Sequence, residues 1–288
     1  MTPGFLVKQL LLGFILPALV ALALVVMAWR PWRAAAGARY ATTGGLALAV
    51  AYALGYWAAS GLPEWPPQQA TEWLVLLAGL AGVWGAVAGV SRLPQVLRVA
   101  GVVAVVGLGY WLQFEPLFRY TWSTAEAVLW LAGVTVLGVM AWVAMERLFV
   151  NEPATVGAFA ACVLTGASAV VLALGGSIFL GQLTGVLAFA LAVLALAARW
   201  VPQSSLAFGS GGALVVLWVG LWMNGAFYAS VPAAAFIALW LMPQAAWLRR
   251  AGWLAERSGW QRGLMISGSG LALALVAAAL TWASSPAF

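Results

Sequence analysis

Long apolar stretches alternate along the chain with short polar, Pro-rich or Arg-rich stretches. A helix needs about 20 mainly apolar residues to cross the hydrocarbon core of a membrane. Ten stretches of roughly this kind lie between the Pro, Gly and Arg residues that interrupt them. We predict membrane-spanning helices over 5–29, 40–60, 72–90, 96–113, 125–147, 154–175, 177–198, 205–224, 231–248 and 261–282.

These spans use most of the 288 residues and leave no room for a soluble domain. We therefore predict an all-α integral membrane protein, a bundle of about ten transmembrane helices with short loops. Residues 1–288 would form a single polytopic transmembrane domain. Gly175, Gly176 and Ser177 alone separate the sixth and seventh spans, so these two form either a tight helical hairpin or one broken segment. Only 7% of residues are charged, against about 25% in soluble domains, which excludes an ordinary water-soluble protein.

Two sequence patterns predict where helices begin. Ser123-Thr124-Ala125-Glu126 has the form of a capping box, in which the Ser and Glu side chains satisfy free backbone donors. Residues 258–261, Ser-Gly-Trp-Gln, have the same form ahead of the last span. Both lie where hydropathy already places the end of a span.

The basic residues predict how the chain lies in the membrane. Eleven of the thirteen fall in alternate loops, whereas the other loops hold only Lys8 and Arg119 with several glutamates. The positive-inside rule places the Arg-rich loops in the cytoplasm. Both termini are therefore predicted on the non-cytoplasmic side, in a multi-pass protein of a bacterial-type inner membrane. The Arg-rich loops contain Arg30, Arg33, Arg39, Arg92, Arg98, Arg147, Arg199, Arg249, Arg250, Arg257 and Arg262.

The composition also limits the chemistry of the chain. It has no His, no Asp and only one Cys, which excludes Ser-His-Asp and Cys-His catalysis and His-ligated metal sites. All charged residues map to loops or to the last turns of helices, so no proton relay crosses the predicted bundle. Basic residues never form a run with interleaved aromatics, so nucleic acid is not an expected partner. We predict a non-enzymatic protein with no catalytic residue, no metal site and no cofactor.

Small residues recur at helical spacing inside two spans. Ala78, Gly82, Gly85 and Gly89 line one face of the third span, and residues 181, 185, 188 and 192 line one face of the seventh. Small residues let helix backbones approach closely. We interpret both stripes as packing faces, with a sliding transporter interface as the alternative.

Polar uncharged residues gather on the sixth and seventh spans, on the outer side of the predicted midplane. At 1.5 Å per residue, most lie roughly 8–12 Å below the outer surface. The group is either a shallow, outward-facing polar site or a set of interhelical hydrogen bonds, and we expect the second. Its members are Thr165, Ser168, Ser177, Gln182 and Thr184.

A segment near the C-terminus mixes tryptophan and arginine. Part of it is predicted to lie along the cytoplasmic headgroup layer, where arginines meet anionic lipid phosphates and indole rings insert. The alternative is a hydrated loop that only follows the positive-inside rule. The candidate lipid contacts are Trp247, Arg249, Arg250, Trp253, Arg257, Trp260 and Arg262.

The lack of buried charge, the short loops and the small-residue faces favour a structural or accessory subunit of a membrane complex. Membrane lipids and other membrane subunits would then be its partners. The alternative is a transporter or facilitator of a neutral or apolar small molecule. Two prolines within spans, Pro17 and Pro243, and the polar hairpin favour that alternative.

Overall fold

The computed structural model describes residues 10–29, 43–90, 93–201, 205–207, 209–250, 254 and 256–284. Every regular element in this part of the chain is helical. In order, the elements are η1 (Leu11–Ile15), α2 (Leu16–Trp29), α3 (Gly44–Ser60), α4 (Ala70–Val90), α5 (Gln95–Tyr120), α6 (Thr124–Asn151), α7 (Ala154–Leu174), α8 (Ile178–Trp200), α9 (Ser210–Tyr228), α10 (Ala233–Leu241), η3 (Pro243–Arg250) and α12 (Gly259–Ser284).

Seven of the described helices are long and apolar enough to cross a membrane, which supports an all-α, multi-pass membrane protein. They are α4, α5, α6, α7, α8, α9 and α12. Helix also covers the three other expected ranges, but η1 with α2, α3, and α10 with η3 are shorter. The structure therefore supports seven spans by length and composition, not the ten that hydropathy predicts.

Proline explains two of the irregular segments. Pro243 lacks a backbone N–H, and α10 ends at Leu241, after which the chain continues as the tighter 3-10 helix η3. Pro17 likewise leaves the carbonyl of Gly13 without its usual donor, and η1 around Gly13 is a π-helix. Both prolines change the helix locally, as kinks would.

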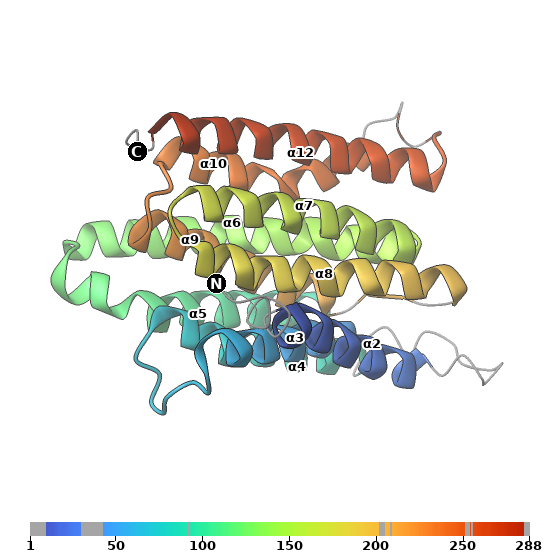
Figure 1. Cartoon of the computed structure of the whole chain (residues 1–288), viewed down its shortest axis with the longest axis horizontal. Coiled ribbons are helices and arrows are strands. Elements are labelled where there is room, and N and C mark those ends of the chain that lie inside the picture. The colour runs from blue at the N-terminus through green and yellow to red at the C-terminus, as the bar shows by residue number, and fades with distance from the viewer. Residues whose placement is uncertain are drawn as a thin grey trace.

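Helix α5 is longer than its expected range of 96–113. It continues through Pro116 to Tyr120, and Glu115 and Arg119 form an exposed ion pair in its last turns. Hydropathy ends the span early because these turns are charged, although helix formation continues. Helices α5 and α6 consequently project beyond the neighbouring helices in Figure 1.

Both predicted capping boxes are confirmed. The Ser123 hydroxyl accepts a hydrogen bond from the Glu126 N–H at 3.4 Å, and the Glu126 carboxylate accepts one from the Ser123 N–H at 2.8 Å. The Ser258 N–H donates to Gln261 Oε1 at 3.1 Å, and the Gln261 N–H donates to the Ser258 hydroxyl at 3.3 Å. Helices α6 and α12 therefore begin where the sequence predicts.

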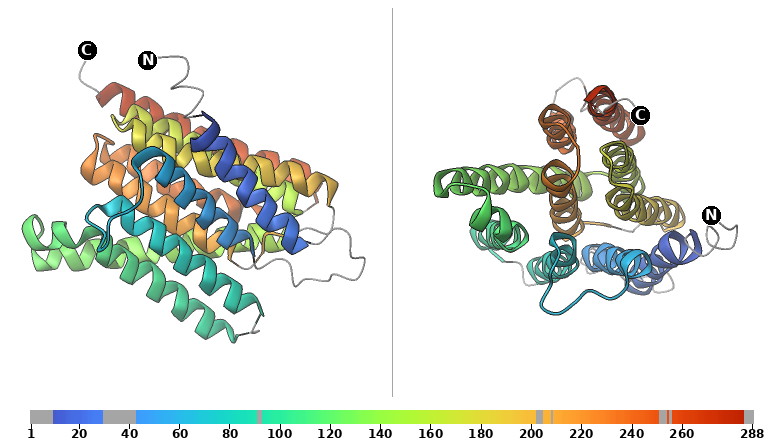
Figure 2. Two further views of the ribbon diagram at one scale, coloured as in Figure 1. Left: turned by 60° about the horizontal axis from the view of Figure 1, so that its bottom comes forward. Right: turned by 60° about the vertical axis from the view of Figure 1, so that its left-hand side comes forward.

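Helix α9 occupies the middle of the bundle. It contacts α3, α4, α5, α6, α7, α8 and α10, and 89% of its most apolar window is buried. Figure 2 shows it surrounded by the other helices. Around it, α7 packs against α8 and α12, and α5 packs against α6.

Glycines allow close helix packing at the start of α9. A Cβ on Gly82 of α4 would lie 3.0 Å from the backbone of Gly45 on α3. Gly209, which precedes α9 with a φ of 120°, sits against Gly45 and Gly85. The small-residue face predicted on α4 is therefore a packing face, as expected.

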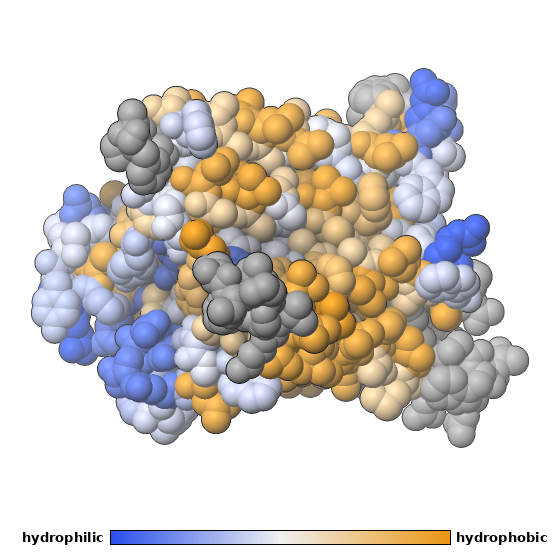
Figure 3. Space-filling model, viewed as in Figure 1, coloured by the Kyte–Doolittle hydropathy of each residue, from blue (hydrophilic) through white to orange (hydrophobic). Residues whose placement is uncertain are grey.

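The described connections gather at two ends of the molecule, with an apolar band between them (Figures 1 and 3). We call one the acidic end, because its charged residues are Glu64, Glu72, Glu115, Arg119 and Glu126 among those described. The opposite end, which we call the basic end, holds most of the arginines. The chain runs back and forth between these ends.

Candidate functional site

The structure places the five predicted polar residues on α7, on α8 and in the turn between them. Thr165, Ser168 and Thr184 are buried, and each hydroxyl donates to the carbonyl four residues earlier in its own helix. Ser177 accepts a hydrogen bond from the Leu180 N–H and so caps α8, and Gln182 is half-buried on α8.

Among the described residues, one of these hydroxyls has a hydrogen bond to another helix. The indole N–H of Trp218 on α9 donates to Thr165 Oγ1 at 3.0 Å. This bond ties α7 to α9 and not to α8. The close α7–α8 hairpin instead depends on small residues, because Gly181 lies against Ala169 and Ala173.

A polar cavity opens at the acidic end. It has a volume of about 380 Å³ and lies between the starts of α4 and α8 and the ends of α5 and α9. We call it the polar cavity. Its lining consists of Gln68, Gln69, Ala70, Thr71, Pro116, Ser177, Phe179, Leu180, Asn224 and Tyr228.

Glu72 fixes the loop that forms one wall of this cavity. Its carboxylate accepts hydrogen bonds from the backbone N–H groups of Gln68, at 2.6 Å, and Gln69, at 3.1 Å. Tyr56 also donates to it, at 3.5 Å. Glu72 is buried but does not line the cavity, so its charge holds the loop and the cavity wall itself is uncharged.

Two amide side chains extend the polar region into the bundle. Asn224, which lines the cavity, donates to the Gly220 carbonyl at 2.7 Å, and Gln113 of α5 donates to the same carbonyl at 3.2 Å. Gln113 is almost fully buried, and its Oε1 has no hydrogen-bond donor within the described part of the chain. A buried acceptor without a donor costs about 1–3 kcal/mol of stability, so the Gln113 amide is kept at this position although it destabilises the fold.

The sequence misses most of this site. Of the predicted residues only Ser177 lines the cavity, and Gln113 is the last residue of an expected span. Gln68, Gln69 and Thr71 flank the Pro-rich loop, and nothing in their spacing shows that α8 begins and α9 ends beside them. The one usable signal is that amide and hydroxyl residues cluster at the outer ends of several spans.

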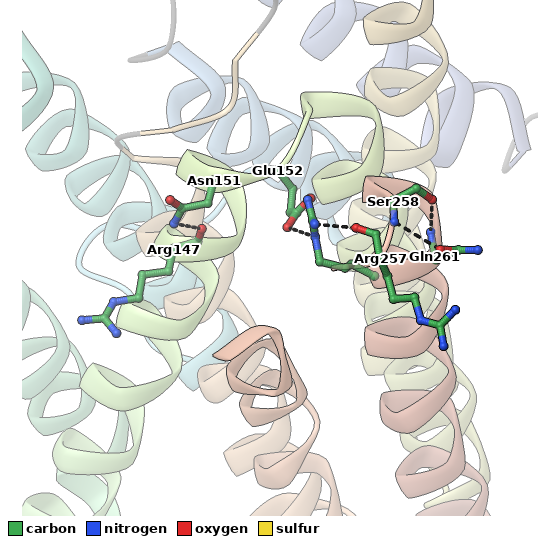
Figure 4. Close-up of polar contacts among 7 residues, drawn as sticks. Arg147, Asn151, Glu152, Arg257, Ser258 and Gln261 are labelled. Carbon is green, nitrogen blue, oxygen red and sulfur yellow. Dashed lines mark hydrogen bonds and ion pairs between the residues drawn. The ribbon is translucent and has the colours of Figure 1, made fainter. Parts of the chain in front are cut away.

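The predicted lipid-contacting residues have different surroundings in the structure. The guanidinium of Arg262 forms an ion pair with Glu152, with Nε–Oε1 at 2.8 Å and a second hydrogen bond at 3.0 Å (Figure 4). Trp247 lies beneath Arg147, 4.7 Å from ring centroid to guanidinium carbon, and donates to Gln244.

Arg257 and Trp260 are exposed at the basic end, and Arg249 and Arg250 end η3. Trp253 lies outside the described residues. Arg262 is therefore engaged within the protein, and among the predicted residues whose side chains the structure describes, Arg257 and Trp260 are exposed and so available to a headgroup layer.

No protein-family model matches the chain, and no characterised protein sequence is significantly similar to it. The functional argument therefore depends on the geometry of the chain itself.

Proposed function

We propose that this non-enzymatic membrane protein binds a small, neutral, polar solute in the polar cavity and transports it across the membrane. The observation that carries the proposal is an uncharged cavity of about 380 Å³ with polar amides continuing below it into the bundle. Ligand pockets have volumes of about 300–1,000 Å³ and a few well-placed polar groups.

The lining chemistry supports a hydroxyl- or amide-bearing solute. Gln68, Gln69 and Asn224 offer amide donors and acceptors, and Thr71 and Ser177 offer hydroxyls. Because no charged side chain of the described residues lines the cavity, an ionic solute would lose its hydration without gaining a counter-charge from them.

Transport, beyond binding alone, is supported by a second cavity that involves the same helices. Residues of α4 and α5, with Gly209 just before α9, line a cavity of about 390 Å³ at the basic end. The 15 residues from Gly209 to Asn224 correspond to about 20 Å of packed helix between the two cavities. Passage would require α5 and α9 to separate where Gln113 meets Gly220.

The proposal includes the orientation inferred from charge. The basic end would face the cytoplasm of a bacterial-type cell, and the polar cavity would open to the outside. The shorter helical segments η1–α2, α3 and α10–η3 would complete ten spans within the bundle, with both termini outside.

Stopped-flow shrinkage of proteoliposomes tests the proposal with glycerol, sorbitol and urea as probes. We expect at least one probe to enter faster than into protein-free liposomes, and Asn224→Leu to abolish the difference. Gln261→Leu is the matched control, because Gln261 is an exposed amide at the other end of the bundle and lines neither cavity. Entry rates equal to those of protein-free liposomes for all three probes, or equal loss in both variants, would contradict the proposal.

Membership of a membrane complex is a second candidate, favoured by the α5–α6 pair. The first ten residues of α6 are exposed or half-buried, and large apolar side chains such as Val128 and Leu129 are exposed. Mild detergent extraction and native gels would test it. We expect a higher-mass species that Leu129→Ser disrupts and Val170→Ser, an exposed position on α7, leaves intact. Migration as the isolated chain would count against this role.

A further inference from the structure

The cavity at the basic end differs in chemistry from the polar cavity, and we call it the arginine cavity. It lies between α4, α5, α6 and the start of α9. Among the residues that the structure describes, two arginines and one glutamate line it: Arg98, Arg147 and Glu146. Apolar side chains, among them Val99 and Val143, form much of the remaining wall.

The glutamate is placed against a helix start. A Cβ on Gly211 would lie 3.0 Å from Glu146 Oε2, so the carboxylate rests on the first turn of α9. The N-terminus of a helix carries a partial positive charge that stabilises a carboxylate. Glu146 therefore faces α9, and neither Arg98 nor Arg147 forms an ion pair with it.

The two arginines have no counter-charge in the described part of the chain. Arg98 is half-buried in the first turn of α5, and its Nε is buried without an acceptor there. Arg147 lies over the Trp247 ring and points away from Glu152 (Figure 4). The unpaired Arg98 Nε in the cavity wall indicates that a molecule bound in the cavity would supply its hydrogen-bond acceptor.

We infer that the arginine cavity binds a phosphate-bearing anion, either a lipid headgroup or a free phosphate. Guanidinium groups pair with phosphate oxygens through charge-assisted hydrogen bonds, often two at once. The first turn of α5, which carries Arg98, adds a second source of positive potential. The apolar wall would accommodate the glycerol and acyl portion of a lipid.

This inference does not depend on the proposed solute. An anion held here would bridge α5 and α6, and through the cavity wall it would also contact α4 and the start of α9. Binding would therefore raise the stability of the bundle whether or not the polar cavity transports anything.

Thermal unfolding in nanodiscs tests the inference. One arm compares phosphatidylcholine with a mixture containing phosphatidylglycerol, and the other adds inorganic phosphate at constant ionic strength. We expect a higher unfolding midpoint in the first arm for a lipid headgroup, or in the second for a free phosphate. Arg98→Gln with Arg147→Gln should abolish the increase, whereas Arg199→Gln with Arg257→Gln, two exposed arginines at the same end, should keep it.

Titration of the same nanodiscs with the stabilising ligand measures how far the substitutions weaken its affinity. Two arginines facing an anionic surface correspond to about 30-fold in affinity, so the double variant should bind about 30-fold more weakly. If it does not fold, Arg147→Gln alone, at an exposed side chain, should still weaken binding about fivefold. An equal increase in all variants, or no increase with either ligand, would overturn the inference.

Discussion

Removing one partner of the Glu152–Arg262 ion pair should destabilise the protein far more than removing an exposed charge. The pair joins the connection between α6 and α7 to the first turns of α12. The Glu152 side chain is 0% exposed and that of Arg262 is 20% exposed. Arg262 also donates to the Arg257 carbonyl at 2.7 Å, so a single guanidinium holds two segments together.

The expected magnitude follows from this burial. Arg262→Gln leaves the Glu152 carboxylate buried without its counter-charge, which typically costs 3–5 kcal/mol. Because Arg262 keeps some contact with solvent, we expect the lower figure, about 3 kcal/mol. For a chain of this length that corresponds to a fall of roughly 6 °C in the unfolding midpoint. The doubly neutral variant, with Glu152→Gln added, should recover much of the loss because no charge remains buried.

Thermal unfolding of the purified protein in one detergent provides the measurement. The Glu115–Arg119 pair offers a matched control, because it is an ion pair on exposed side chains. Arg119→Gln should cost less than about 1 kcal/mol. Equal midpoints for Arg262→Gln and Arg119→Gln, or a double variant that is no better than the single one, would refute the reasoning. A fall in bound anionic lipid without a fall in stability would instead restore Arg262 as a lipid contact.

Three further outcomes are expected. In a cysteine-free background, a cysteine at Gln68 should react with an impermeant thiol reagent in intact cells and one at Ser258 only after permeabilisation; the reverse result would invert the orientation. Gly82→Ala should lower the free energy of unfolding by about 1–3 kcal/mol, because the added Cβ would meet backbone atoms. Gly79→Ala on the same helix meets nothing and should be neutral or stabilising, and unfolding of both variants checks this. Thr165→Val, which removes the acceptor of the Trp218 indole N–H, should lower the free energy of unfolding by only about 0.6 kcal/mol, the average for interhelical hydrogen bonds in membranes. A loss above about 2 kcal/mol would contradict this expectation.

Local features were predictable from the sequence because local residues determine them. The Ser123 and Ser258 capping boxes need only a hydroxyl and a carboxylate or amide three residues apart, and both begin helices as expected. Hydropathy likewise located helix in every expected range. Seven of the ten ranges contain a described helix long enough to count as a span, and hydropathy does not register that α10 ends at Leu241, just before Pro243.

The cavities could not be predicted, because they depend on which helix ends meet. Asn224 and Gln68 are far apart in sequence, and only the packing of α9 beside α4 brings them to one wall. Arg262 shows the same limit in another form. Its sequence surroundings predict a headgroup contact, and they do not show that it hydrogen-bonds Glu152, 110 residues earlier.

The nearly complete burial of α9 bears on how the chain is assembled during synthesis. Helix α9 has the lowest mean hydropathy of the seven long helices, and 89% of its most apolar window is buried inside the protein. Seven of the described helices, from α2 to α8, leave the ribosome before it does. Until α9 is made, Gly85 on the glycine face of α4 lacks its contact with Gly209, and the Gln113 amide lacks the Gly220 carbonyl to which it donates. The translocon must therefore deliver a weakly hydrophobic helix into the centre of a bundle whose surrounding helices have largely been made already.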